Sequence, residues 1–154
     1  MLTHLEICNS EVTHIQVTER LQNPGHGGQS FFFGVVRNRN HGRVVKAVTY
    51  DCHPELSRSV LETIILECRS QFGENLDAVV IHATNRIEPG GISVAIGVST
   101  PHRDEAFLAC RYIIEQIKVR LPVWKQEHYE DGDSEWLKGH ELCQHGNRKQ
   151  EDHK

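Results

Sequence analysis

The sequence predicts one α+β domain over residues 1–138, with two long helices against a mainly antiparallel sheet, and a polar tail over residues 139–154. Two observations favour this fold. Several β-rich runs occur along the chain, and they alternate with two long stretches whose apolar residues recur at helical spacing. A third is the length of 154 residues, which suits a single domain with a core of its own.

The first third of the chain reads mostly as strands. Residues 3–10 ("THLEICNS") alternate as a strand does, and residues 17–22 ("VTERLQ") give a weak helical signal. Two β-rich runs follow, "SFFFGVVR" at 30–37 and "VVKAVTYD" at 44–51. The Asn and Gly residues between these runs are typical of a turn, so the two runs are expected to pair as a hairpin.

An amphipathic helix is expected between Pro54 and Gly73. Its apolar residues recur every four positions, at Leu56, Val60, Ile64, Cys68 and Phe72. The segments "DAVVIH" at 77–82 and "GISVAIGVS" at 91–99 then read as strands. The first of these is short and apolar, which indicates a buried strand.

A second helix is expected after the "STP" that precedes His102. Ser99 or Thr100 can cap this helix, and Pro101 suits its first position. Pro122 cannot continue a helix, so the helix is expected to end near Arg120. The buried stripe is expected to comprise Ala106, Phe107, Cys110, Ile114, Ile117 and Leu121.

Composition and charge exclude several classes of protein. The net charge of −4, with signs mixed along the chain, gives no basic stripe for a nucleic-acid backbone. No apolar run approaches the roughly 20 residues that cross a bilayer, and the first residues lack the order of a signal peptide. The five cysteines include no C-x-x-C pair, which indicates a reducing compartment. A cytoplasmic protein without membrane or nucleic-acid partners is therefore expected.

The eleven histidines raise the question of a metal site. The tail segment "HELCQH" brings His140, Cys143 and His145 close together in sequence. No fourth ligand stands at a fixed spacing from them, so adventitious binding is favoured over a structural site. No metal and no cofactor are assigned.

Two cationic residues, His102 and Arg103, begin the last helix. Positive charge there opposes the helix dipole, at a cost of a few tenths to about 1 kcal/mol. Free backbone amides, an imidazole and a guanidinium at one helix end can together hold a phosphate or a carboxylate. In the alternative interpretation, both side chains are solvated and Asp104 and Glu105 offset their charge.

Two lysines flank the end of the same helix in the stretch "IKVRLPVWKQE". Lys118 follows Glu115 by three residues, so it can belong to a lattice of surface ion pairs. Alternatively, Lys118, Arg120 and Lys125 crowd together beside Trp124, and mutual repulsion in a partly dry site lowers lysine pKa values. A lysine prepared in this way can transfer protons or form a covalent adduct.

Two further charged clusters give weaker signals. Arg37 stands beside Arg39 and Arg43 at an expected hairpin tip, which is typical of a soluble edge as well as of a binding site. The acidic run from Glu127 to Glu135 reads as a solvated loop or as a surface that steers a basic partner.

Three segments of the chain carry the pattern of a known family. "FFFGVVRNRNHGRVV" is similar to the pattern F-x-G-x-V-R-x-x-N-x-G, and "TYDCHPEL" to Y-E-x-Y-P-E. "STPHRDEAFLACRYIIEQIKVRLPVWKQEHYEDGDSEW" is similar to H-R-x-x-A-F followed by L-K-x-x-x-P-x-W-K-x-E and a later Gly and Trp. From about Gly27 to Trp136 the chain thus resembles the MoaE family, the large subunit of molybdopterin synthase, which implies an α/β-hammerhead-like fold.

The resemblance implies a sulfurtransferase of molybdenum cofactor biosynthesis. In that family, sulfur passes from the C-terminal Gly-Gly thiocarboxylate of a small ubiquitin-like subunit, the MoaD type, to cyclic pyranopterin monophosphate, which becomes the dithiolene of molybdopterin. A homodimer within a two-plus-two heterotetramer is also implied. Lys118 and Lys125 match the two essential lysines, and Arg37, His102 and Arg103 match contacts to the substrate anion. The matching pocket segments contain Phe32, the backbone of Val35 and Val36, Gln126 and Glu127.

Arg103 and Lys118 are too far apart to contact one small substrate within a single chain. Their separation of 15 residues corresponds to about 22 Å along a helix. We therefore expect His102 and Arg103 of one protomer to complete the lysine site of its partner across a two-fold axis.

The chain also departs from the family pattern. Where the family usually has His-Arg-x-Gly after the third core strand, this chain has "HATN", with Ala83 and Asn85 at the Arg and Gly positions. Asp51 and His53 replace the usual Glu and Tyr. An alternative function follows from such changes: a non-catalytic module that docks a ubiquitin-like partner. The intact lysine block favours an active enzyme.

Overall fold

The computed structural model describes residues 1–138. A four-stranded sheet forms its centre, in the order β1 (Thr3–Cys8), β5 (Asp77–Ala83), β7 (Ile92–Thr100) and β2 (Gly28–Val35). The β1–β5 pair is parallel, and the pairs β5–β7 and β7–β2 are antiparallel. The predicted mixture of a mainly antiparallel sheet with two long helices is confirmed.

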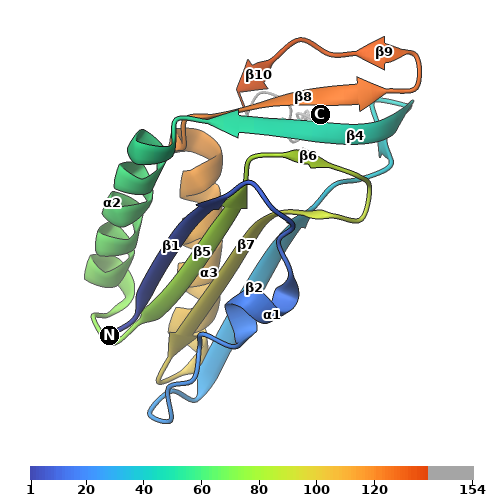
Figure 1. Ribbon diagram of the computed structural model, residues 1–154. Coiled ribbons are helices and arrows are strands. Elements are labelled where there is room, and N and C mark those ends of the chain that lie inside the picture. The colour runs from blue at the N-terminus through green and yellow to red at the C-terminus, as the bar shows by residue number, and fades with distance from the viewer. Residues whose placement is uncertain (139–154) are drawn as a thin grey trace, which may run out of the picture.

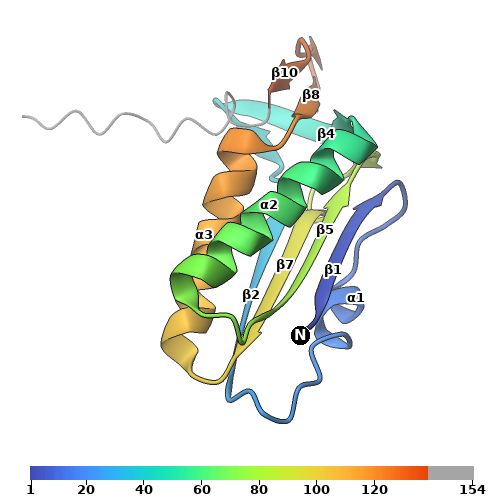
Figure 2. The ribbon, with the colours of Figure 1, turned by 90° about the vertical axis from the view of Figure 1, so that its left-hand side faces the viewer.

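The two faces of this sheet are covered by different helices. The long helices α2 (Pro54–Phe72) and α3 (Arg103–Arg120) lie side by side on one face, and the short α1 (His14–Thr18) lies on the other (Figures 1 and 2). Because side chains alternate along a strand, Val80 of β5 joins the core under α2 and α3, whereas Val79 joins the core on the α1 side.

A second sheet lies across the end of the first, where α3 ends and the chain continues into β8 (Figure 1). Its strands β4 and β8 pair antiparallel, so that Lys125 lies opposite Tyr50 and Glu127 opposite Val48. The six strands are β10 (Leu137–Lys138), β8 (Val123–Tyr129), β4 (Arg43–Cys52), β3 (Arg39–Asn40), β6 (Arg86–Ile87) and β9 (Gly132–Asp133).

The predicted hairpin between residues 30–37 and 44–51 is wrong. β2 pairs with β7, whereas β4 pairs with β8, so the two runs belong to different sheets. The Asn and Gly residues do form a turn, but it belongs to a smaller hairpin between β3 and β4, in which His41 and Gly42 both have positive φ, 50° and 73°. A β-rich run indicates a strand without specifying its partner, which long-range packing decides.

The limits of α3 differ at one end from the prediction. The helix ends at Arg120 as expected, but its N-cap is His102, so neither Ser99 nor Thr100 caps it and Pro101 lies ahead of the helix. The predicted burial of Phe107 is also wrong, because its side chain is 62% exposed. The face against the sheet instead contains Ala106, Ala109, Cys110, Ile113 and Ile117.

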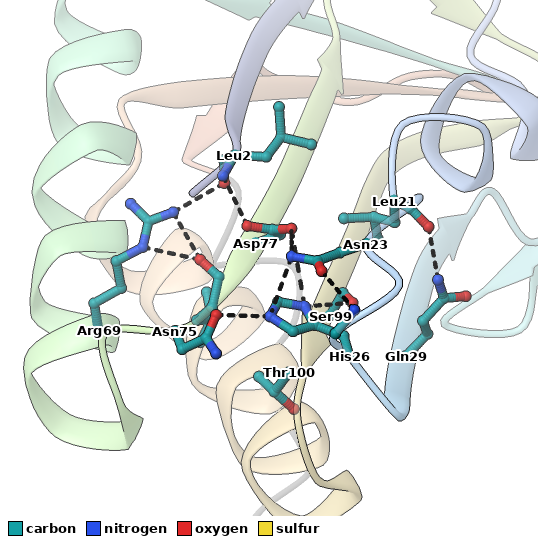
Figure 3. Close-up of polar contacts among 12 residues, drawn as sticks. Leu2, Leu21, Asn23, His26, Gln29, Arg69, Asn75, Asp77, Ser99 and Thr100 are labelled. Atoms are coloured by element: carbon teal, nitrogen blue, oxygen red, sulfur yellow. Dashed lines mark hydrogen bonds and ion pairs between the residues drawn. The ribbon is translucent and has the colours of Figure 1, made fainter.

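A buried polar network holds the loop before β2 against the ends of β5 and β7 (Figure 3). The Asp77 carboxylate accepts hydrogen bonds from the Leu2 amide at 2.7 Å and from Asn23 Nδ2 at 3.0 Å. The His26 ring lies in the same network, with Nδ1 at 2.8 Å from Ser99 Oγ. The loop is thus fixed beside the point where β7 leads into α3.

Within residues 1–138, no helix has the length and apolar character needed to span a bilayer. Four cysteines lie in this part of the chain, and all of them are unpaired.

Candidate active site

A cavity of about 410 Å³ lies at the junction of the two sheets. Its wall includes the end of β2, the β3–β4 hairpin, the last turn of α3 and one face of β8. Four cationic side chains line it: Arg37, Arg39, Lys118 and Lys125. The accumulation of positive charge in a concave site is suited to an anionic ligand.

The two lysines reach this cavity from different elements. Lys118 is half-buried in the last turn of α3, which ends at Arg120 because Pro122 follows and Leu121 is already extended (φ −71°, ψ 127°). Lys125 is the third residue of β8 and is only 8% exposed. The short connection around Pro122 therefore brings two amines that are seven positions apart to one cavity.

Glu127 is more deeply buried than the composition of its acidic segment predicts. The composition of the acidic run predicts a solvated loop or a steering surface, whereas the family resemblance predicts a pocket segment. Glu127 belongs to β8, is 4% exposed and lines the cavity. Its carboxylate accepts hydrogen bonds from Asn40 Nδ2 and from the Tyr129 hydroxyl. These donors replace hydrogen bonds that the carboxylate loses when it is buried.

A histidine that the sequence had not placed in the site lies behind both lysines. His82, at the end of β5, lines a small adjoining cavity of about 30 Å³ together with Tyr50, Lys118 and Lys125. Burial lowers the pKa of His82 to about 4; the hydrogen bond from Nδ1 to the Ala83 carbonyl, 2.8 Å long, opposes this effect and the charge of Lys118 adds to it. The imidazole is therefore neutral near pH 7. The retained His of "HATN" was the only signal for it in the sequence.

Of the remaining predicted residues in this region, two line the cavity and two do not. Val35 and Val36 line the wall, but the Val36 amide already donates to the Gly91 carbonyl at 3.0 Å. The Gln126 side chain points away from Lys125 across β8 and donates to the Ser134 carbonyl at 3.2 Å. Phe32 is 38% exposed on β2 and does not line the cavity.

His102 and Arg103 lie at the opposite end of α3 from the lysines, and both are exposed. The His102 side chain borders a separate hollow of about 220 Å³. One chain therefore brings Arg37, Lys118, Lys125 and Glu127 together, but it does not bring His102 or Arg103 to them.

No group of three or more His, Cys, Asp or Glu side chains in residues 1–138 is arranged to hold a metal ion. The tail residues His140, Cys143 and His145, which the sequence had raised as a candidate cluster, lie outside the described residues.

The fold and the cavity together define an α+β protein with a cationic site that carries two lysines. Residues 7–120 match the model of the family described as "MoaE protein", and the chain belongs to this family. The family predicted from the sequence motifs is thereby confirmed.

Individual relatives agree with this assignment. The molybdopterin synthase catalytic subunit of Synechococcus elongatus is 47% identical over 119 residues, which cover 77% of this chain and 72% of that relative. The crystal structure of molybdopterin synthase from Staphylococcus aureus superimposes with a TM-score of 0.82 at 28% identity and covers 89% of this chain and 98% of that one. A complex of subunits 1 and 2 of molybdopterin-converting factor from Helicobacter pylori shares the fold, with a TM-score of 0.71 at 16% identity and coverage of 84% of this chain and 87% of that one.

Proposed function

We propose that this MoaE-family protein is the catalytic subunit of a molybdopterin synthase. In this role it transfers sulfur from the C-terminal thiocarboxylate of a small ubiquitin-like subunit to cyclic pyranopterin monophosphate, forming the dithiolene of molybdopterin. The observation that carries the proposal is the convergence of Lys118 and Lys125 with Arg37 in one cavity.

The chemistry of the cavity suits both reactants. Arg37 offers a planar set of N–H donors to the cyclic phosphate, with Arg39 beside it. A lysine ammonium can hold the thiocarboxylate by charge while its sulfur remains available to attack the side-chain carbons of the pterin. Lys118 or Lys125 then transfers the protons that this substitution requires.

The assembly we propose is a homodimer that binds two small subunits. His102 and Arg103 stand about 22 Å along α3 from Lys118, at the 1.5 Å rise per residue of a helix. In a two-fold dimer, these side chains from one protomer can supply the anion contacts at the lysine cavity of the other. The whole complex works in the cytoplasm and involves neither nucleic acid nor a membrane.

Conversion of the cyclic pterin precursor to molybdopterin, with a thiocarboxylated small subunit as the sulfur source, tests the proposed function. We expect Lys118→Ala to lower the rate by about 100-fold or more, because proton transfer and orientation by one side chain contribute at least that factor. Lys46→Ala is the matched control, since Lys46 is exposed on β4 and should turn over normally.

The same assay separates the enzyme from the alternative function. If the wild-type protein binds the small subunit but forms no product, the protein is a docking module on the same fold. Equal rates for Lys118→Ala and wild type would contradict the catalytic placement of this lysine while leaving the enzyme in place.

A further inference from the structure

The carboxylate of Glu127 is held at the cavity wall by hydrogen bonds from Asn40 and Tyr129. Asn40 Nδ2 lies 3.0 Å from Oε1 and 2.8 Å from Oε2, and the Tyr129 hydroxyl donates to Oε2. Asn40 Nδ2 is also 3.2 Å from the Tyr129 hydroxyl oxygen. A carboxylate has about four acceptor positions, and these contacts use three, so the group is fixed in one orientation.

The second sheet keeps both donors in place. Asn40 is paired with Arg43 in the tight β3–β4 hairpin, next to the turn with two positive φ angles. The Arg43 guanidinium covers the Tyr129 ring at 3.6 Å from its centroid, and its Nη2 donates to Asp131 at 2.6 Å. The ring of Tyr129 is therefore fixed from the outside, and its hydroxyl is directed inward.

Glu127 and Lys125 face the same cavity because they are two residues apart on β8. Both side chains are at least nine-tenths buried. A buried ammonium group keeps its charge and position only where an opposite charge compensates for lost solvation. Among the described residues that line this cavity, Glu127 is the one with a carboxylate, and the charged side chains around it are cationic.

We propose that Asn40 and Tyr129 are positioning residues for Lys125: they fix the Glu127 carboxylate beside it, and this carboxylate sets the position and protonation of the lysine during sulfur transfer. The inference rests on the proposed function. The titratable or charged groups that line the two cavities with Lys125 are Lys118 from α3, Arg37 from the segment after β2, Arg39 from β3, His41 from the turn after β3, Tyr50 from β4, His82 from β5 and Glu127 from β8.

Tyr129→Phe tests the inference by removing one hydroxyl while leaving the ring under Arg43. We expect kcat to fall by roughly 10-fold, the loss that one hydrogen bond to a charged group typically represents, with little change in KM. The limb of the kcat–pH profile that depends on Lys125 should move to lower pH, because a less ordered carboxylate favours the ammonium form less. Tyr112→Phe is the matched control, since its hydroxyl donates to Glu67 on the surface between α2 and α3.

A second variant, Asn40→Ser, keeps the inference testable if Tyr129→Phe does not fold, and the same shift in the pH profile is expected. A folded variant whose profile coincides with that of the wild type would overturn the inference and leave the proposed function intact. Absence of product from the wild type would instead overturn the proposed function.

Discussion

Because His82 is buried in its neutral form, we predict that the free energy of unfolding depends on pH. An unfolded His has a pKa near 6.5, whereas burial lowers the pKa of His82 to about 4. Between these two values the unfolded chain binds the proton and the folded chain does not, so the free energy of unfolding decreases as the pH falls from about 6.5 to about 4. At about 1.4 kcal/mol per pKa unit, the loss amounts to about 3 kcal/mol.

Urea unfolding of the wild type and of His82→Gln, each at pH 7.5 and pH 4.5, measures this loss. The carboxylates titrate in both proteins, so the difference between the two pH-dependent changes isolates the imidazole. We expect the wild type to lose about 2–3 kcal/mol more than His82→Gln over this interval, because glutamine takes up no proton. Identical pH dependence in the two proteins would refute the reasoning and would mean that His82 is solvated or already paired with an anion.

Two further predictions concern the start of α3. A Cβ added at Gly28 would lie 2.9 Å from Arg103 Cα. We therefore expect Gly28→Ala to displace the first turn of α3 and to lower kcat/KM by about 10- to 100-fold in the synthase assay. Gly25→Ala is the control, because its Cβ would meet only the Asn23 side chain, and we expect it to leave kcat/KM unchanged. In a mixed dimer of Arg103→Ala and Lys118→Ala protomers, sharing across the interface predicts one restored site per dimer, whereas no recovered activity would contradict the shared site.

The sequence was sufficient for the existence and the C-terminal ends of the two long helices, because these signals are local, whereas the short α1 (His14–Thr18) begins ahead of the weak signal at residues 17–22. The four-residue spacing that begins at Leu56 predicted α2 over the same residues that the structure gives, and Pro122 predicted the end of α3. Strand partners were not predictable in the same way, since almost sixty residues separate β2 from its partner β7 and seventy separate β4 from its partner β8. Such pairings depend on which faces can be buried together, and the residues of a single strand do not encode that choice.

In the candidate site, too, the residues that belong to local motifs were predictable, whereas burial that depends on strand pairing was not. Arg37, Lys118 and Lys125 were predicted from motifs, and the structure brings them to one cavity. The resemblance placed Glu127 in a pocket segment, but its burial could not be derived from composition, because four further acidic residues follow it before Trp136. Only the alternation of β8 places Glu127 on the inner face, and that alternation becomes visible once β8 is paired with β4.

The two ends of α3 carry positive charge for different physical reasons. At the C-terminal end, the helix dipole favours the ammonium of Lys118, so this charge needs no further explanation. At the N-terminal end, the dipole disfavours the Arg103 guanidinium, and the Asp104 and Glu105 side chains that follow reduce the cost without removing the free backbone amides. An anion bound at that end would satisfy the amides and the guanidinium together. This energetic asymmetry favours a role for the N-terminal end of α3 at a bound anion, which in the proposed dimer is the substrate held by the lysines of the other protomer.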